Sequence, residues 1–99
     1  MSQKNGIEDG KPGFVYMVEC SDGTLYTGWT TDAERRVEMH NQGQGAKYTR
    51  SRLPVTLVYL EKIRGKSEGL RREAAIKKLR RKQKEQLICS AYNLLGSRE

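Results

Sequence analysis

The fold is decided by two runs of sequence, Phe14-Val15-Tyr16-Met17-Val18 and Thr24-Leu25-Tyr26-Thr27-Gly28-Trp29-Thr30. Both runs are rich in β-branched and aromatic residues, which are typical of strands. Between them, Ser21-Asp22-Gly23 supplies the residue types that form tight turns. The sequence therefore predicts an antiparallel β-hairpin near the start of the chain.

The segment after the hairpin carries a signal for the start of a helix. Thr31 and Glu34 form the Thr-x-x-Glu pattern of a capping box, in which both side chains satisfy backbone amides of the first turn. The pattern predicts a helix over residues 32–41. Within it, Arg36 and His40 are one turn apart on the same face, so the two side chains can act together.

The middle of the chain is predicted to contain a loop and a buried strand. Residues 42–53 show no sustained periodicity and include Lys47-Tyr48-Thr49-Arg50, so we expect a loop long enough to carry function. The next run, Val55–Leu60, is almost continuously apolar. This pattern predicts a strand that is buried on both faces and lies in the centre of the sheet.

Two amphipathic helices are predicted in the last third of the chain, one beginning near Ser67 and one over residues 86–95. The predicted inner stripe of the first helix consists of Leu70, Ala74, Ile76 and Leu79. The order β-β-α-β-α-α predicts a single α+β domain over residues 13–95, in which a small, mostly antiparallel three-stranded sheet packs against helices. Polar tails are expected at 1–12 and 96–99.

The distribution of charge restricts the classes of partner. The chain has 99 residues with 19 Lys or Arg and 12 Asp or Glu, a net charge of +7, and eleven of the cations lie between Lys62 and Lys84. A positive segment attracts polyanions through phosphate neutralisation and counterion release. Nucleic acid is the leading candidate. An anionic membrane or an acidic protein would be drawn by the same charges, and a solvated helix face would need no partner.

The sequence lacks the features of membrane-spanning proteins and of secreted proteins. No stretch approaches the roughly 18 apolar residues of a membrane-spanning helix, and residues 1–13 lack the apolar region of a secretory signal. We therefore expect a cytoplasmic protein with no membrane association. Cys20 and Cys89 lie far apart with no Cys-x-x-Cys pair, so reduced thiols are expected rather than a disulfide framework or a zinc site.

Several elements, in order along the chain, resemble the GIY-YIG nuclease domain. The matching positions are Val15-Tyr16, Leu25-Tyr26-Thr27-Gly28, Arg36, His40, Gly45-Ala46-Lys47-Tyr48-Thr49-Arg50 and Leu70-Arg71-Arg72-Glu73. The likeness extends from about Phe14 to Leu87 and is greatest to the small stand-alone bacterial members. Phe14 stands where the first motif usually begins with glycine, and Thr27 where the second has Ile or Val. The resemblance implies the GIY-YIG fold.

The resemblance also implies a metal-dependent endonuclease that hydrolyses DNA in a single step, with a role for a divalent cation. Glu73 would be the metal ligand, because a hard carboxylate oxygen suits Mg²⁺ or Mn²⁺. The metal would polarise the phosphate and stabilise the departing oxygen. Without the family pattern, Glu73 would be interpreted as the partner of Arg72 or Lys77 in a surface ion pair.

The remaining catalytic residues implied by the resemblance are a tyrosine pair, an arginine and a histidine. Tyr16 and Tyr26 would activate water, but tyrosine ordinarily has a pKa of about 10. Arg36, His40 or metal-bound water could assist them. Arg36 would also hold the phosphate, and His40 would exchange protons near neutral pH. Gly28 would let the backbone approach closely beside Tyr26.

The tyrosine pair requires a particular loop length in the hairpin, because both rings must lie on the same face of the sheet. Tyr16 and Tyr26 are directly opposed on one face only if the connecting loop has an odd length centred on Ser21, or if a bulge intervenes. A two-residue turn at Asp22-Gly23 would place the two rings on opposite faces of the sheet.

Other cations and one aromatic ring are candidates for substrate contact. They are Lys47, Tyr48, Arg50, Arg71, Arg72 and Lys77. We expect DNA as the partner, recognised by its structure more than by its sequence, in repair or recombination, with an additional protein as a further source of specificity and a monomer as the default state. The alternatives are a non-catalytic adaptor that binds nucleic acid and a basic domain that binds acidic proteins.

Overall fold

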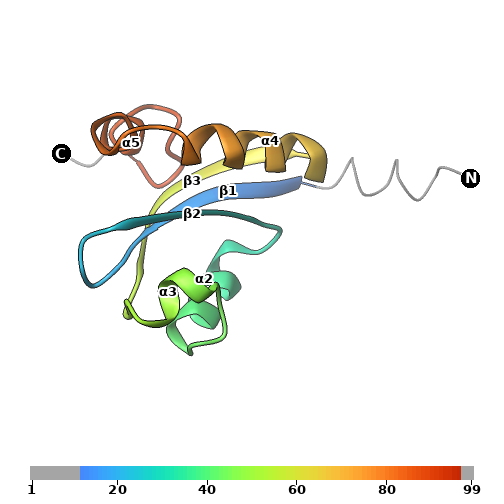
Figure 1. Cartoon of the computed structure of the whole chain (residues 1–99). Helices are drawn as coiled ribbons and strands as arrows, with labels where there is room; N and C mark the ends of the chain where they lie inside the picture. Colours follow the sequence, from blue (N-terminus) through green and yellow to red (C-terminus); the bar gives the residue numbers. More distant parts are fainter. Residues whose placement is uncertain (1–11, 97–99) are drawn as a thin grey trace, which may run out of the picture.

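The computed structural model describes residues 12–96. It shows a three-stranded antiparallel sheet between two layers of helices (Figure 1). The elements are β1 (Pro12–Glu19), β2 (Leu25–Thr30), α2 (Ala33–Asn41), α3 (Lys47–Arg50), β3 (Thr56–Arg64), α4 (Lys66–Lys77) and α5 (Arg81–Ile88). Helices α2 and α3 cover one face of the sheet, and α4 and α5 cover the other. The predicted α+β class and the predicted hairpin are confirmed.

The register of the hairpin places both motif tyrosines on the same face. Tyr16 pairs with Gly28, and Val18 pairs with Tyr26. Because side chains of a strand alternate between faces, the two tyrosines are diagonal neighbours on the face covered by α2 and α3. They are not directly opposed, since Gly28 occupies the position across from Tyr16.

The hairpin loop has the odd length that this register requires. The Cys20 N–H donates to the Thr24 carbonyl at 2.8 Å, and residues 21–23 form the loop. The loop is therefore centred on Asp22, one residue beyond Ser21, and this shift makes the tyrosines diagonal rather than opposed.

Strand β3 lies at an edge of the sheet, so the prediction of a central position was wrong. The strand order is β2-β1-β3, and β1 occupies the centre. The apolar run does not mark a central strand because helices cover both faces of the sheet, so that residues 57–60 are buried or half-buried even at the edge. Leu57 and Leu60 pack toward one cluster, whereas Val58 and Tyr59 belong to the other.

The C-terminal segment protects the exposed edge of β3. The Leu94 N–H donates to the Leu60 carbonyl at 2.8 Å. The buried Asn93 amide accepts from the Leu60 and Leu95 N–H groups and donates to the carbonyls of Val58 and Ile88. Asn93 therefore has a structural role, and its bonds satisfy a strand edge that could otherwise pair with another chain.

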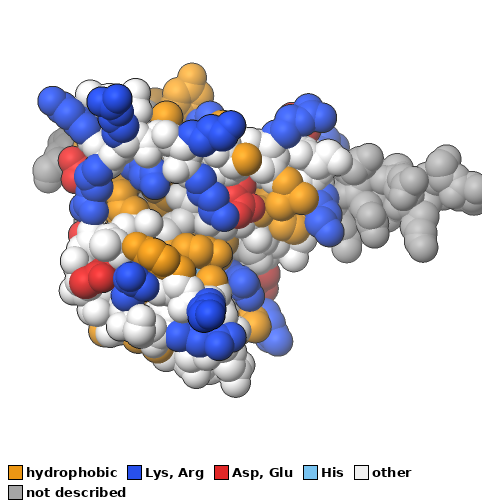
Figure 2. All heavy atoms as spheres, viewed as in Figure 1, with side chains coloured by type: hydrophobic (Ala, Val, Ile, Leu, Met, Phe, Trp, Pro, Cys, Tyr) orange, Lys and Arg blue, Asp and Glu red, His pale blue; other side chains and the backbone are white. Residues whose placement is uncertain are grey.

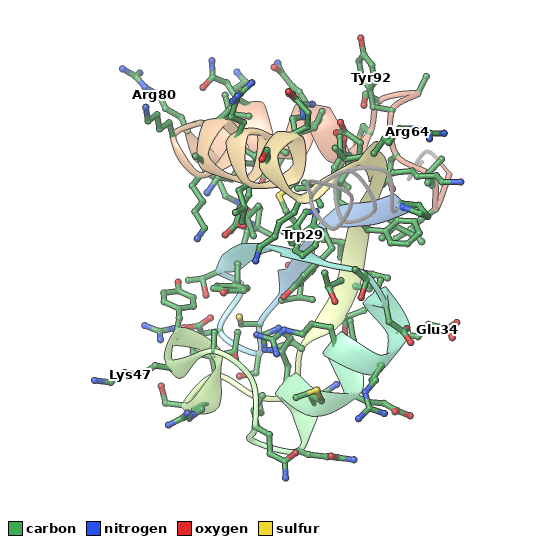
Figure 3. The ribbon with its side chains drawn as sticks, turned by 90° about the vertical axis from the view of Figure 1, so that its right-hand side faces the viewer. Trp29, Glu34, Lys47, Arg64, Arg80 and Tyr92 are labelled. Atoms are coloured by element: carbon green, nitrogen blue, oxygen red, sulfur yellow. The ribbon has the colours of Figure 1, made fainter. Side chains whose placement is uncertain are left out.

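The inward face of α4 differs from the predicted stripe. Ile76 is buried as predicted, but Leu70 is 46% exposed and Ala74 is exposed, so both of those predictions were wrong. Gly69 is the other buried residue of the helix. A Cβ there would overlap the Trp29 indole, which fills the space between the sheet and α4 (Figure 3).

Three boundaries also differ from the predictions. Asp32, and not Thr31, caps α2, because its carboxylate accepts from the Arg35 N–H at 3.2 Å. The predicted loop over 42–53 contains the single-turn helix α3. The last helix covers Arg81–Ile88 instead of 86–95. The amphipathic pattern continues beyond Ile88, but the residues there form turns, which the hydrogen bonds of Asn93 stabilise.

The sheet begins at the first described residue, Pro12. Pro12 already pairs with Arg64, so the sheet begins within the predicted N-terminal tail. The rest of that tail and residues 97–99 lie outside the described part. Within residues 12–96, no helix has the length and apolar character needed to cross a bilayer.

Candidate active site

The centre of the candidate site is a buried hydrogen bond between Tyr16 and His40. Tyr16 extends from β1, and His40 from the last turn of α2, 24 residues later in the chain. The Tyr16 Oη and the His40 Nε2 are 2.9 Å apart. His40 is fully buried and Tyr16 is 1% exposed, so this bond lies in a medium where electrostatic interactions are stronger than in water.

Burial changes the proton affinity of both groups. Burial raises the pKa of Tyr16 to about 12; Arg36 opposes this effect, and electrostatic interactions with Tyr26 and with the Glu73 carboxylate add to it. Burial also lowers the pKa of His40, and the charge of Arg36 lowers it further. Near neutral pH, therefore, Tyr16 holds its proton and His40 is an uncharged imidazole that can accept one.

Arg36 and Tyr26 complete the group around Tyr16. Arg36 is half-buried on α2, and its guanidinium lowers the pKa of the Tyr16 hydroxyl. The Tyr26 ring lies 6.5 Å from the Tyr16 ring and meets the His40 ring edge-on at 5.5 Å. Four of the five predicted catalytic residues, Tyr16, Tyr26, Arg36 and His40, thus come together on one side of the sheet.

Two glycines make room for the buried pair. A Cβ at Gly28 would lie 2.5 Å from the Tyr16 Oη, so the ring that crosses Gly28 is that of Tyr16, and not Tyr26 as the sequence suggested. A Cβ at Gly45 would overlap the His40 Nδ1. Both positions need glycine because a side chain would displace the hydrogen-bonded pair.

Tyr26 and Tyr48 form the partly exposed rim of the site. Their rings stack with centroids 5.9 Å apart, and the Arg52 guanidinium lies 3.9 Å from the centroid of the Tyr48 ring. The Lys77 ammonium lies 5.8 Å from the centroid of the Tyr26 ring. The predicted base-stacking ring of Tyr48 therefore already has two partners, and any base that stacks on it would have to displace one of them or use the ring edge.

Glu73 approaches the same group from the opposite helical layer. Its carboxylate pairs with Lys77 at 2.7 Å, and its side chain is only 16% exposed. The charge of Glu73 acts on the Tyr16 phenol, and Lys77 contacts the Tyr26 ring. The ion pair expected for a purely structural Glu73 is thus present, and it lies within reach of the tyrosines.

The donor set around Glu73 suits one kind of metal. Among the side chains of residues 12–96, no cluster of three or more His, Cys, Asp and Glu could hold an ion. Mg²⁺ needs no such cluster, because it binds through one or two carboxylates, water and substrate phosphate. Glu73 fits that requirement as a single carboxylate, whereas a structural zinc site has no counterpart in the described residues.

Arg72, a predicted phosphate contact, is held within the protein. Its Nε donates to both carboxylate oxygens of Glu61 and its Nη2 to one of them, each at 3.1 Å. The buried Tyr59 hydroxyl donates to the same carboxylate. This network joins α4 to β3 and favours a structural role for Arg72. Arg71 pairs with Glu68 at 3.0 Å on the exposed side of the helix.

Cations from both helical layers surround the rim. Lys47 and Arg50 are exposed on α3. Lys47 projects from one layer and Arg80 from the other, toward the same side of the molecule (Figure 3). Figure 2 shows this side, where Lys and Arg side chains lie over both layers and an apolar band lies between them. A polyanion placed across the band would meet positive charge on both sides.

Two contributors to the site were not assigned a role from the sequence. Thr49 and Gly45 lie in the segment that matches the family pattern, but only the cations and the ring of that segment were interpreted. A buried threonine on a single-turn helix gives no periodic signal. The only available hint was the match of Gly45-Ala46-Lys47-Tyr48-Thr49-Arg50 itself.

The site combines a tyrosine pair from the sheet, Arg36 and His40 from α2, and Glu73 from α4. This combination is the one that the resemblance to the GIY-YIG nuclease domain implies. The GIY-YIG catalytic domain profile matches residues 12–86, and the chain belongs to this family. The predicted family is therefore confirmed, and with it a domain of the nuclease type.

Within the family, the chain is similar to proteins named UPF0213. It is 63% identical over 74 residues to one from Halobacterium salinarum, covering 75% of this chain and 96% of the relative. It is 59% identical over 75 residues to one from Staphylococcus aureus, covering 76% and 92%. The solution NMR structure of a UPF0213 protein from Bacillus halodurans has a TM-score of 0.54 at 44% identity, over 85% of this chain and 89% of that one.

Proposed function

We propose that this protein is a metal-dependent endonuclease that hydrolyses phosphodiester bonds of DNA and selects its substrate by structure. The observation that carries the proposal is the buried Tyr16–His40 hydrogen bond, on which Arg36 and Glu73 also act. Selection by structure is proposed because the exposed cations beside the site, Lys47 and Arg50, suit contacts with the phosphate backbone, which carry no sequence information directly. DNA repair and recombination supply branched and flapped substrates of this kind.

Water activation is assigned to Tyr16. The Tyr16 oxygen takes a proton from the attacking water while its own proton passes to the His40 Nε2, 2.9 Å away. This transfer is needed because a phenol with a pKa of about 12 is not ionised at neutral pH. Tyr26, whose ring faces Tyr48 and Lys77, borders the entrance for the substrate.

Charge stabilisation is assigned to Arg36 and Glu73. The guanidinium of Arg36 presents a planar set of donors suited to a phosphate that is gaining charge. Glu73 would hold Mg²⁺ or Mn²⁺, which supplies Lewis-acid stabilisation of the phosphate and the leaving oxygen. Because Lys77 is paired with Glu73, its ammonium becomes available to the substrate when the carboxylate takes another partner.

The main alternative is a non-catalytic adaptor that binds nucleic acid. The Lys and Arg side chains over both helical layers would support it equally well (Figure 2). An adaptor, however, has no physical need for a buried, uncharged histidine bonded to a tyrosine, because burying polar groups reduces stability unless they are fully paired. The proposed setting is the cytoplasm, with a monomer as the default state and an additional protein as a further source of specificity.

The test is a panel of labelled DNA substrates: single strand, duplex, flap and four-way junction. We expect cleavage of branched or flapped DNA that requires Mg²⁺ or Mn²⁺ and stops with EDTA. Tyr16→Phe should lose cleavage and keep binding, since it lacks only the hydroxyl. Binding without cleavage of any substrate under all metal conditions would favour the adaptor.

A further inference from the structure

The imidazole of His40 has a second partner, the hydroxyl of Thr49. The His40 Nδ1 and the Thr49 Oγ1 are 2.9 Å apart, and both residues are fully buried. Thr49 belongs to α3, which begins after Gly45 at the point where the missing Cβ leaves room for the His40 ring. The imidazole therefore lies between Tyr16 on one nitrogen and Thr49 on the other.

The direction of each hydrogen bond follows from counting protons. The Thr49 hydroxyl has one proton, which it donates to the Ala46 carbonyl at 2.9 Å; the same carbonyl also accepts the Thr49 N–H at 3.1 Å. The Thr49 oxygen is then left as an acceptor, so the His40 Nδ1 must carry the proton that joins them. In an uncharged imidazole with this tautomer, Nε2 carries a lone pair and no proton. The Tyr16 hydroxyl therefore donates the hydrogen bond to Nε2.

We infer that Thr49 is a positioning residue, which holds His40 in the tautomer with the proton on Nδ1 and so keeps Nε2 free to accept a proton from Tyr16. The tautomer stands on the hydrogen bonds alone, whereas its use in catalysis rests on the proposed function. The chain runs from the Ala46 carbonyl through Thr49 and His40 to Tyr16, and each link is 2.9 Å long. While the Thr49 proton is donated to the Ala46 carbonyl, the opposite tautomer would place two lone pairs, those of Nδ1 and Thr49 Oγ1, against each other; that tautomer requires the Thr49 hydroxyl to turn from the carbonyl to Nδ1.

The experiment uses the fact that the chain contains one histidine. Long-range ¹H–¹⁵N correlation spectra of the full-length protein at pH 7.5 report directly which ring nitrogen carries the proton. We expect the Nδ1–H tautomer in the wild type and in Thr49→Ser, which keeps the hydroxyl. In Thr49→Val, which has nearly the same volume but no acceptor, we expect a shift toward the Nε2–H tautomer.

Two outcomes would overturn the inference: a wild-type spectrum dominated by the Nε2–H tautomer, or an unchanged Nδ1–H tautomer in folded Thr49→Val. The wild-type spectrum decides even when Thr49→Val does not fold. If the protein cleaves DNA, Thr49→Val should lower kcat by about tenfold or more with little change in KM, and Thr49→Ser should restore it; tautomer reversal in a Ser-His-Asp triad costs up to about 10⁴-fold. Absence of all cleavage would count against the proposed function and leave the spectra unaffected.

Discussion

At the scale of single residues, His40 couples the stability of the protein to pH. Its pKa is lower in the folded protein than in the unfolded chain, so the unfolded chain binds the proton more tightly. Stability is therefore complete above the ordinary histidine pKa of about 6.5 and declines as the pH falls from there toward the folded-state value.

The corresponding prediction concerns unfolding by urea at pH 7.5 and pH 5.5. The free energy of unfolding of the wild type should fall by up to about 1.4 kcal/mol between these values, the equivalent of one pKa unit. His40→Gln, which cannot titrate, is the control and should show no such fall. Equal or greater wild-type stability at pH 5.5 would mean that His40 is not held uncharged.

The glycine opposite Tyr16 gives a second prediction at this scale. In Gly28→Ala, the new Cβ would lie 2.5 Å from the Tyr16 Oη and force the ring away from His40. We expect destabilisation of about 1–3 kcal/mol, as for other overpacked sites, together with loss of cleavage. Thr30→Ala, two residues further along β2, controls for substitution in this strand. Thermal unfolding measures the effect, and a Gly28→Ala protein with unchanged Tm would refute the close packing.

Sequence reasoning recovered single residues where a motif marked them and missed those that only support the motif. Tyr16, Tyr26, Arg36 and His40 were predicted as a group, and the structure brings them together. Thr49 was missed because its role depends on a hydroxyl that meets a histidine nine residues away, which no local pattern encodes.

At the scale of elements, the orientation of α4 depends on an ion pair and not only on apolar contacts. Glu61 of β3 and Arg72 of α4 form a bidentate pair with side chains 16% and 34% exposed. Since Glu73 follows Arg72 directly, this pair helps to determine where the Glu73 carboxylate lies. The amphipathic pattern could not predict this arrangement, because it treats charged residues as solvent-facing.

The prediction for this element is a double-mutant cycle with Glu61→Gln and Arg72→Met. Each single variant should lose about 1–3 kcal/mol of unfolding free energy, because the remaining partner is left without its counter-charge in a partly buried place. The double variant should lose less than the sum of the two. Strictly additive losses would show that the two side chains do not interact.

At the scale of the whole molecule, the structure brings cations from separate segments to one side. Lys47 of α3 and Arg80 before α5 project toward the same face, although they are far apart in the sequence. The sequence predicted the basic segment and the class of fold, but not this common side, because it depends on which helices cover which face. The misplaced β3 has the same origin, since layers on both faces are a property of the assembled sheet.

The prediction for the whole molecule is the salt dependence of DNA binding. Lys47→Ala and Arg50→Ala should each weaken binding and lower the slope of log K against log salt by about 1, as expected for the loss of one phosphate contact. Arg72→Met should change the slope little, because its guanidinium is bound to Glu61. Fluorescence anisotropy with a labelled junction measures the binding of all three variants. A large decrease in slope for Arg72→Met would show that Arg72 contacts a DNA phosphate after all.

The most direct test of the proposed function compares the wild type with Glu73→Gln and Lys77→Gln on a labelled four-way junction and a flap, with Mg²⁺ and with EDTA. Glu73→Gln should abolish cleavage while its affinity for DNA stays within about threefold, since it removes one carboxylate charge at the centre of the proposed metal site. Lys77→Gln is the matched control, because it breaks the same ion pair and leaves the carboxylate; it should bind DNA more weakly but still cleave at saturating DNA. Cleavage by Glu73→Gln at the wild-type rate, or cleavage that persists in EDTA, would contradict a metal-dependent nuclease centred on Glu73.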